Sequence, residues 1–217
     1  MKKLFVFMTC WRFVLHWIYF KYAKNRDVIS DDLARNISQF VLKKGADNYS
    51  HNDISFYRFC YLLSSYKMVR NIFYARVARY HRLFVLFLKM LAPSQSFLDI
   101  SPTADIGGGL IIQHGYSTII DPIKMGRNCW VNQNVTIGYA NDVDAPIIGD
   151  NVTVYTGAVI VGAVIIGNNV IVAANAAVVN DVNNNCVVGG VPAKIIKNQI
   201  RLVYSRCVAS FRRLFGG

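Results

Sequence analysis

The sequence predicts a mainly β protein in which residues 99–197 wind into a three-sided parallel β-helix. An α-helical region over residues 1–98 precedes it, and a short basic helix over residues 198–217 follows it. Three observations support this prediction: aliphatic residues recur every six positions beyond residue 100, Gly and Asn follow many of them, and the first 98 residues read instead as helices. Hydrophobic residues make up 53% of the 217 positions, which is enough for a packed core.

The six-residue period is most regular near the end of the repeat region. β-Branched aliphatic residues occupy every sixth position there: Ile148, Val154, Ile160, Ile166, Val172 and Val178. Four residues after each stands a small or apolar companion: Val152, Ala158, Val164, Val170, Ala176 and Val182. An α-helix would give a spacing near 3.6 and an ordinary strand a spacing of 2, so neither explains this period. We interpret each unit as one short strand and a corner, with three units closing one coil.

The same frame runs upstream with two irregularities. Its aliphatic positions are Ile100, Ile106, Ile112, Thr118, Met125, Val131 and Ile137, and its companions are Ala104, Leu110, Tyr116, Cys129 and Val135. One extra residue follows Thr118, and five extra residues separate Ile137 from Ile148. The larger insertion predicts a loop over residues 139–146 that extends from the regular body.

Charge is distributed unevenly along the chain. Residues 1–98 carry 16 Lys and Arg against five Asp, residues 99–193 carry two against seven, and residues 194–217 carry six and no acid. No nucleic-acid recognition module is present, so we expect no nucleic acid as partner. The basic head fits an anionic membrane surface or an anionic substrate, and the alternative is a solvated face that keeps the protein soluble.

The run from Leu4 to Phe20 is almost wholly apolar but does not form a typical targeting segment. Arg12 and His16 interrupt the apolar run and no small-residue cleavage site follows it, so we expect neither a signal peptide nor a membrane span. Thr9, Arg12 and His16 would form one polar stripe on a helix. Two interpretations stay open: this helix packs against another helix or a neighbouring subunit, or residues 1–24 make peripheral contact with a membrane.

A second strongly apolar helix is expected over residues 82–91, and residues 30–79 between the two apolar segments read as helical. Arginines near the end of this stretch suggest a basic strip: Arg70, Arg76, Arg79 and Arg82. The five cysteines form no CxxC pair, which argues against a disulfide framework and a structural zinc site. We therefore expect a reduced, cytoplasmic setting, with the inner face of the membrane as a peripheral location.

Residues 99–197 resemble the hexapeptide-repeat acyltransferases, and within that superfamily the serine-acetyltransferase type. The motifs that carry the resemblance are Asp99-Ile-Ser-Pro102, Ile106-Gly-Gly-Gly-Leu-Ile-Ile-Gln-His114-Gly115 and Gly190-Val-Pro-Ala-Lys194. The resemblance implies a left-handed β-helix, acetyl-CoA as acyl donor, and a homotrimer with active sites between neighbouring subunits. In some members, two trimers pair through the helical region.

Transfer of an acetyl group to a hydroxyl needs a base for the hydroxyl proton and a groove that positions the donor. His114 is the only histidine of the repeat region and lies outside the aliphatic frame, so it should point outward. An imidazole titrates near neutral pH, which suits a general base. The resemblance assigns this role to His114, and it gives Asp99, fifteen residues earlier, the role of orienting the ring. The alternatives are a surface histidine without a role and an Asp that only caps a turn.

The resemblance also implies sites for the donor and the acceptor. Positions matched to the acetyl-CoA groove are Tyr139, Thr156, Ala174, Lys194 and Lys197, with the two lysines as point charges for CoA phosphates. Positions expected around the acceptor are Gln113, Gly115, Tyr116, Asn132, Gln133, Asp142 and Asp144. A catalytic zinc needs about three protein ligands, and the repeat region offers one histidine, so no metal is expected.

Two departures from the serine acetyltransferases affect the expected acceptor. Gln113 stands where that group has an acidic residue, and the loop from Tyr139 to Pro146 lacks its Arg-His pair. An amino-acid carboxylate favours a cation, whereas this loop carries Asp142 and Asp144. Gly107 to Gly115, with Cys129-Trp-Val-Asn-Gln133, looks more like acetyltransferases of surface-polysaccharide biosynthesis.

The sequence therefore predicts an acetyl-CoA-dependent O-acetyltransferase that acts on a sugar hydroxyl of a surface polysaccharide or its precursor. One alternative is a serine O-acetyltransferase of cysteine biosynthesis, and another is acyl transfer to a sugar amine. An alternative of another class is a β-helix that serves only as a scaffold or as a membrane-binding module.

Overall fold

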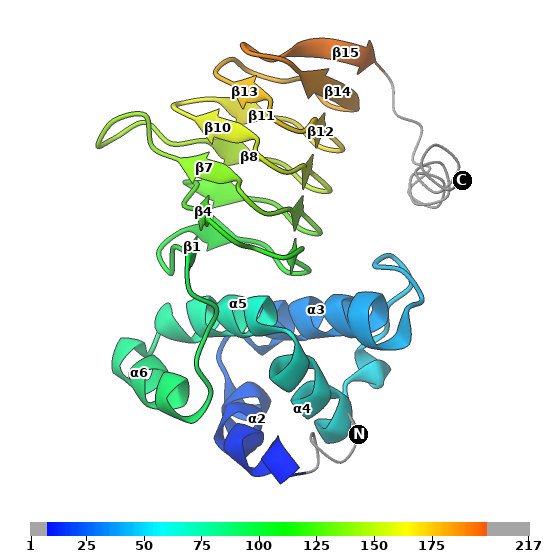
Figure 1. The fold of residues 1–217 in the computed structure, drawn as a ribbon, viewed down its shortest axis with the longest axis vertical. Coiled ribbons are helices and arrows are strands. Elements are labelled where there is room, and N and C mark those ends of the chain that lie inside the picture. Colours follow the sequence, from blue (N-terminus) through cyan, green and yellow to red (C-terminus); the bar gives the residue numbers. More distant parts are fainter. Residues whose placement is uncertain (1–7, 199–217) are drawn as a thin grey trace.

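The computed structural model describes residues 8–198. It shows a helical region followed by a parallel β-helix of about five coils, stacked along the long axis of the molecule (Figure 1). The predicted fold class is therefore confirmed. Residues 199–217, which include nearly all of the expected C-terminal helix, lie outside the described residues, and Asn198 ends a strand.

The helical region ends at α6, just before the first strand. Its described elements are η1 (Cys10–Phe13), α2 (Val14–Tyr22), α3 (Arg26–Asn36), the π-helical η2 (Ile37–Leu42), η3 (His51–Asp53), α4 (Phe56–Ser65), α5 (Lys67–Ala78) and α6 (Arg82–Leu91). Figure 1 shows α3 and α5 directly beneath the β-helix, while α2 and α4 lie further from it. Within residues 8–198, no helix has the length and apolar character needed to cross a bilayer.

The β-helix has three parallel faces, each built from one strand of successive coils. The first face stacks β1 (Leu98–Ile100), β4 (Thr118–Ile120), β7 (Thr136–Gly138), β10 (Val159–Val161) and β13 (Ala177–Val178). The second stacks β2 (Asp105–Ile106), β5 (Lys124–Met125), β8 (Ile147–Ile148) and β11 (Ile165–Ile166). The third stacks β3 (Ile111–Ile112), β6 (Trp130–Val131), β9 (Thr153–Val154), β12 (Ile171–Val172) and β14 (Cys186–Gly189), and β15 (Lys194–Asn198) folds back antiparallel on β14.

The repeat residues fill the interior of the coils. Every aliphatic position from Ile148 to Val178, and every companion from Val152 to Val182, is buried in one continuous core. Corners between the second and third faces use left-handed Asn residues, and Asn169 donates from its Nδ2 to Asn185 Oδ1 at 2.8 Å in the coil above. The period of six thus arises because each coil repeats the same inward side chain and the same corner.

The predicted frame is wrong at one coil. Ile120, not Thr118, pairs with Ile100 and points inward, and Thr118 is its buried companion. Tyr116, expected as a companion, is 61% exposed. The extra residues of this coil lie at the corner between Ile112 and Thr118. The insertion therefore comes before Thr118, whereas the sequence pattern placed it after Thr118.

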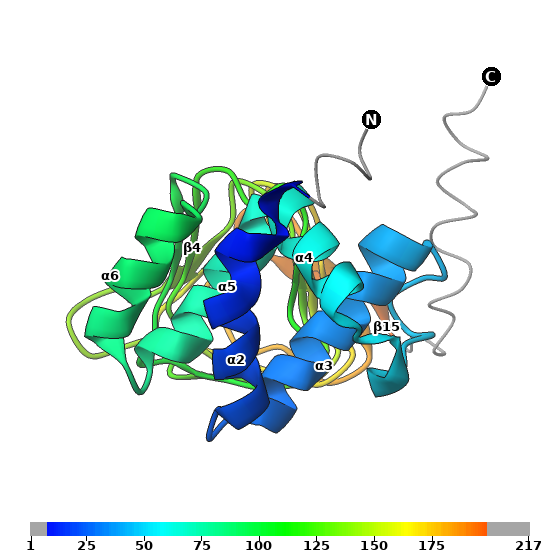
Figure 2. The same ribbon diagram turned by 90° about the horizontal axis from the view of Figure 1, so that it is seen from below.

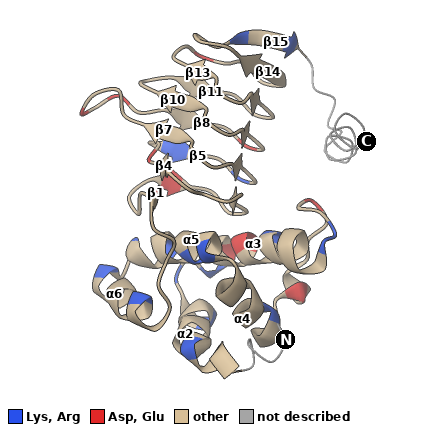
Figure 3. Cartoon of the chain, in the orientation of Figure 1, with Lys and Arg blue, Asp and Glu red and all other residues tan. Residues whose placement is uncertain are grey.

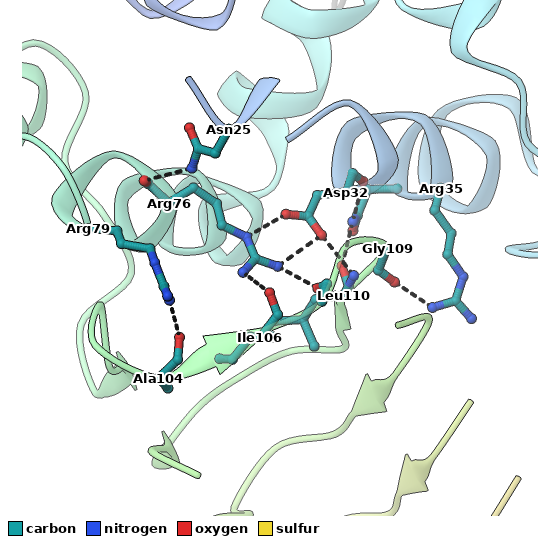
Figure 4. A network of polar contacts seen from close by, with 11 residues as sticks. Asn25, Asp32, Arg35, Arg76, Arg79, Ala104, Ile106, Gly109 and Leu110 are labelled. Carbon is teal, nitrogen blue, oxygen red and sulfur yellow. Dashed lines mark hydrogen bonds and ion pairs between the residues drawn. The ribbon is translucent and has the colours of Figure 1, made fainter. Parts of the chain in front are cut away.

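Side chains of α3 and α5 cover the lower edge of the first coil. Arg76 donates to the carbonyls of Ile106 and Gly107 at 2.6 and 2.8 Å, and Arg79 donates to Ala104 O at 2.8 Å (Figure 4). Asn36 donates to Leu110 O at 2.8 Å. An exposed sheet edge carries unpaired backbone groups, so these donors both satisfy the edge and close the β-helix.

Asp32 holds this cap in place. Its carboxylate accepts from Arg76 Nε at 2.8 Å and from the backbone N–H of Leu110 at 2.8 Å, and the residue is only 3% exposed. Burial raises the pKa of the Asp32 carboxyl, while Arg76 and the backbone donors act in the opposite direction. The expected basic strip is therefore wrong for Arg76, which is a buried, paired residue rather than a surface cation.

We expect Asp32→Ala to lower the free energy of unfolding by about 3–5 kcal/mol, because it leaves the Arg76 guanidinium buried without its partner. Chemical denaturation measures this change. Asp27→Ala is the control, since Asp27 is an exposed acid of the first turn of the same helix, and its loss should stay below about 1 kcal/mol. Equal losses in the two variants would contradict the assigned role of Asp32.

Candidate active site

His114 lies on an irregular corner between β3 and β4. The backbone is left-handed at His114 (φ 67°), Gly115 (φ 66°) and Ser117 (φ 49°). A side-chain-bearing residue pays a conformational cost in this region, and such residues cluster at functional sites. The corner exposes the His114 side chain, as its position outside the aliphatic frame predicted.

Close packing fixes the shape of this corner. A Cβ added to Gly115 would stand 2.8 Å from Ile112 Cγ2 and 2.9 Å from Leu98 Cδ2, so only glycine fits between these two side chains. Gln95 donates from its Nε2 to the carbonyl of His114 at 2.6 Å. The imidazole is thus presented on a backbone that is held from below and from within the core.

A residue of the helical region supports Gln95 in turn. Asn71 of α5 donates to the carbonyls of Gln95 and Leu98, both at 3.0 Å, and its Oδ1 accepts from the backbone N–H of Gln95 at 2.8 Å. Sequence reasoning missed both Asn71 and Gln95. Their local sequence, with Arg70 before Asn71 and a serine on each side of Gln95, does not reveal their partners.

Three predicted residues stack above His114 on one edge of the β-helix. The strands of the third face pair in register through Ile112, Val131, Val154 and Val172. His114, Gln133, Thr156 and Ala174 each stand two residues beyond one of these positions. Backbone hydrogen bonds join the corners, from Gly157 N to Gln133 O at 3.2 Å and from Asn175 N to Thr156 O at 2.9 Å. Above Gln133 the side chains along this edge are small, which leaves room for an extended ligand to lie along it.

Asp99 of β1 makes no polar contact with His114. It is an exposed, outward residue of β1, next to Leu98, which packs on Gly115. Within residues 8–198, no hydrogen bond or ion pair joins Asp99 to His114. Asp99 thus lies on the strand that pairs with β4, and His114 on the corner that leads into β4, while their pairing stays a prediction.

Three other residues expected near the acceptor belong to this corner or to the coil above it. Gln113 is half-buried, and its backbone N–H donates to Val131 O at 2.9 Å. Tyr116 is exposed beside His114. Asn132 lies one coil above, where its Oδ1 accepts from Trp130 Nε1 at 2.8 Å. Their role around an acceptor stays a prediction.

The extruded loop lies at a different corner. Residues 139–146 connect β7 to β8, across the first face from the His114 corner (Figure 1). Asn141 organises the loop, since its Nδ2 donates to Asp144 Oδ2 at 2.7 Å and its Oδ1 accepts from Val143 N at 2.9 Å. Tyr139 and Asp142 are exposed there. Within one chain, the expected loop residues and His114 thus form two separate groups.

Lys194 and Lys197 lie at the far end of the β-helix. Both belong to β15, are exposed, and pair with β14 through Gly189 and Val187. Four strand steps separate β3 from β14 on this face, which corresponds to roughly 19 Å at the usual strand spacing. The two lysines are therefore remote from His114 but close to the upper end of the same face.

We expect Gly115→Ala to destabilise the protein by about 2 kcal/mol more than Gly45→Ala. Both glycines have positive φ, so an alanine at either position is strained by the left-handed backbone. Only Gly115 is also tightly packed, because the nearest atom to a Cβ at Gly45 is 4.0 Å away. Thermal and chemical denaturation of the two variants measure the difference. Equal losses would mean that the His114 corner is not tightly packed.

Comparisons with curated proteins identify serine acetyltransferases as relatives, although no family model matches the chain. The serine acetyltransferase of Staphylococcus xylosus is 33% identical over 110 residues, which cover 49% of this chain and 51% of that protein. The serine acetyltransferase of Bacillus subtilis (strain 168) is 26% identical over 165 residues, which cover 72% of this chain and 76% of that protein. The match thus spans about half the length of the first relative.

Solved structures show the same relationship. The crystal structure of Neisseria gonorrhoeae serine acetyltransferase superposes with a TM-score of 0.62 and 25% identity, covering 81% of this chain and 67% of that one. Soybean serine acetyltransferase complexed with serine gives a TM-score of 0.62 and 26% identity, covering 82% and 72%. Both matches extend through the helical region as well as the coils. The chain is therefore similar to serine acetyltransferases over both its helical region and its coils, and its hexapeptide-repeat β-helix is serine-acetyltransferase-like.

Proposed function

We propose that this protein is an acetyl-CoA-dependent O-acetyltransferase with His114 as its general base. The observation that carries the proposal is an exposed imidazole on a strained, tightly held corner, at the foot of an edge whose upper residues are small. The relatives named as serine acetyltransferases support the same class of reaction.

In the proposed reaction, His114 removes the hydroxyl proton while the acceptor oxygen attacks the carbonyl carbon of the thioester. The resulting tetrahedral intermediate expels the CoA sulfur, and the imidazolium returns the proton to that thiolate. The products are an acetyl ester and free CoA, so the base is regenerated. Asp99 would accept a hydrogen bond from the other ring nitrogen and stabilise the imidazolium. Its place beside Leu98, under the same corner, supports this role.

Acetyl-CoA would lie along the edge above His114. Thr156 and Ala174 leave space for the pantetheine arm, and the exposed Lys194 and Lys197 could meet the phosphates at the upper end. We infer a homotrimer, in which a neighbouring subunit supplies the second wall of this groove and brings a loop 139–146 to the site, because within one chain the loop and His114 lie at different corners.

L-serine is the first acceptor to test. Both solved structures and both curated proteins described above are serine acetyltransferases, and the soybean enzyme is complexed with serine. These relationships favour serine over the sugar acceptor that the sequence suggested as its main prediction.

A sugar hydroxyl is the second candidate, because of the loop. Asp142 is exposed and, within the described residues, accepts no hydrogen bond, while Asp144 is bound to Asn141. A free carboxylate suits sugar hydroxyls and repels the carboxylate of an amino acid. A cytoplasmic setting and membrane contact through residues 1–24 also remain predictions.

We expect His114→Ala to lower turnover by about 10²–10⁴-fold while acetyl-CoA still binds, because the base is lost and the groove is not. Thiol release measures turnover, and calorimetry measures binding. His81→Ala is the matched control, since His81 is an exposed histidine of the helical region and should leave turnover unchanged. Turnover in His114→Ala close to that of the wild type would refute the assigned base.

The acceptor is identified by comparing thiol release with L-serine and with a panel of soluble saccharides, with mass spectrometry to detect the added acetyl group. The reaction with L-serine should release thiol if this protein uses the same acceptor as its serine acetyltransferase relatives. Asp142→Asn should then raise kcat/KM for serine by about fivefold, because it removes one repulsive charge, and should lower it for a sugar. Absence of acetyl-CoA binding would instead favour a non-catalytic scaffold.

A further inference from the structure

The amphipathic character of α2 is inverted. The polar stripe of η1 and α2 turns toward the other helices. His16 is fully buried there and hydrogen-bonded to Tyr74 Oη at 3.0 Å, while the half-buried Arg12 of η1 donates from its Nε to Leu91 O at 2.5 Å. Burial and the charge of Arg70 lower the pKa of His16 to about 4, so it is neutral. The outward stripe, which begins before α2 in the segment of Met8 and η1, is apolar, with a spacing of three and four residues: Met8, Trp11, Leu15, Ile18 and Tyr22. Trp11 is 67% and Tyr22 86% exposed.

Helix α6 lies antiparallel beside α2 and has a second exposed apolar stripe: Leu83, Leu86, Phe87 and Met90. Tyr19 stacks on Phe84 with ring centroids 5.8 Å apart, and an open groove of about 370 Å³ runs between the two helices. Figures 1 and 2 place α2 on the face of the helical region turned away from the β-helix, with α6 beside it. We call this surface of α2 and α6 the apolar platform.

Three cations gather at one end of the platform without a counter-ion. Lys89 Nζ lies 6.0 Å from the ring centroid of Tyr74, and the charges of Arg12 and Arg70 both act on the same tyrosine. Arg70 is only 7% exposed, and its Nε has no hydrogen-bond partner. Within residues 8–198, no carboxylate pairs with any of the three, and the remaining residues contain no Asp or Glu. Buried charges are normally paired, so this end lacks an anion.

Charge decides between a membrane and a second copy of the chain. Residues 1–24 and 82–91 together carry seven Lys and Arg and no acid, and Figure 3 shows Lys and Arg on α2 and α6 without acidic neighbours on these helices. A second copy placed on the platform would therefore set cations against cations. A bilayer with anionic headgroups complements both the apolar stripes and the cations.

We propose that the apolar platform docks on an anionic phospholipid bilayer, with α2 and α6 lying in the interface, the exposed Lys89 and the half-buried Arg12 meeting a lipid phosphate, and the buried charge of Arg70 attracting it from beneath. Trp11 and Tyr22 are suited to the headgroup level, because each combines an apolar ring with a polar group. The β-helix would then lie on the side of the helical region that faces away from the membrane. Docking requires no step of acetyl transfer, so it can be tested independently.

The test is flotation of the full-length protein with vesicles of phosphatidylcholine alone and of phosphatidylcholine with phosphatidylglycerol. The wild type should float with the anionic vesicles and lose this binding at high salt. Ile18→Glu and Leu86→Glu should weaken binding at least tenfold, because each places a charge in the apolar contact. Lys89→Gln should weaken it about fivefold. Val191→Glu is the matched control, since Val191 is an exposed apolar residue at the other end of the molecule.

Arg70→Met tests the phosphate site. It should reduce the preference for anionic vesicles about fivefold without lowering the melting temperature in the absence of lipid, because the charge that it removes has no partner. His114→Ala should float like the wild type, which separates docking from catalysis.

Three results would overturn the proposal. One is equal flotation of Ile18→Glu, Val191→Glu and the wild type. Another is that the wild type binds no vesicles, while sedimentation without lipid shows that Ile18→Glu has a different oligomeric state from the wild type. The platform would then be a protein interface. The third is that inorganic phosphate stabilises the wild type but not Arg70→Met, while the wild type binds no vesicles. The three cations would then form a site for a soluble anion.

Discussion

The open edge of the first coil is the constraint on which the rest of this structure depends. A β-helix pairs each coil with the next, so its first coil has no partner below and would expose backbone carbonyls. In this protein, Arg76, Arg79 and Asn36 donate to those carbonyls, and Asp32 holds Arg76 through a buried ion pair. The helical region is therefore the lower cap of the β-helix, and the two parts form one structure.

The same cap reaches the candidate active site through a short chain of hydrogen bonds. Asn71 of α5 binds the segment that leads into β1, and Gln95 of that segment binds the carbonyl of His114. The strained corner of His114 is thus supported both by the core, through Gly115, and by the helices, through Gln95. Such support fixes the backbone that carries the imidazole, and a fixed backbone helps to position a general base.

The two sides of the helical region face different environments. The side toward the β-helix uses charged and amide groups to satisfy backbone carbonyls, whereas the opposite side exposes apolar stripes and leaves Arg70 without a partner. Such a division is consistent with a protein whose catalytic edge is held at a distance from the surface on which it docks. The proposed membrane contact and the proposed chemistry would then lie on different sides of the helical region, with His114 in the first coil and the apolar platform on the face turned away from the β-helix.

The sequence by itself determined the β-helix, its inward residues, the loop over residues 139–146 and the outward position of His114, because a period of six repeats the same local environment in each coil. It misplaced the frame at Thr118, since extra residues at a corner can be assigned to either of its sides when only spacing is known. Asn71 and Gln95 could not be found, nor the burial of Arg76, because these residues meet partners far along the chain. Only the tertiary structure decided which stripe of α2 faces inward: both stripes have helical spacing, and the choice depends on Tyr74 and Leu91, which a local pattern does not include.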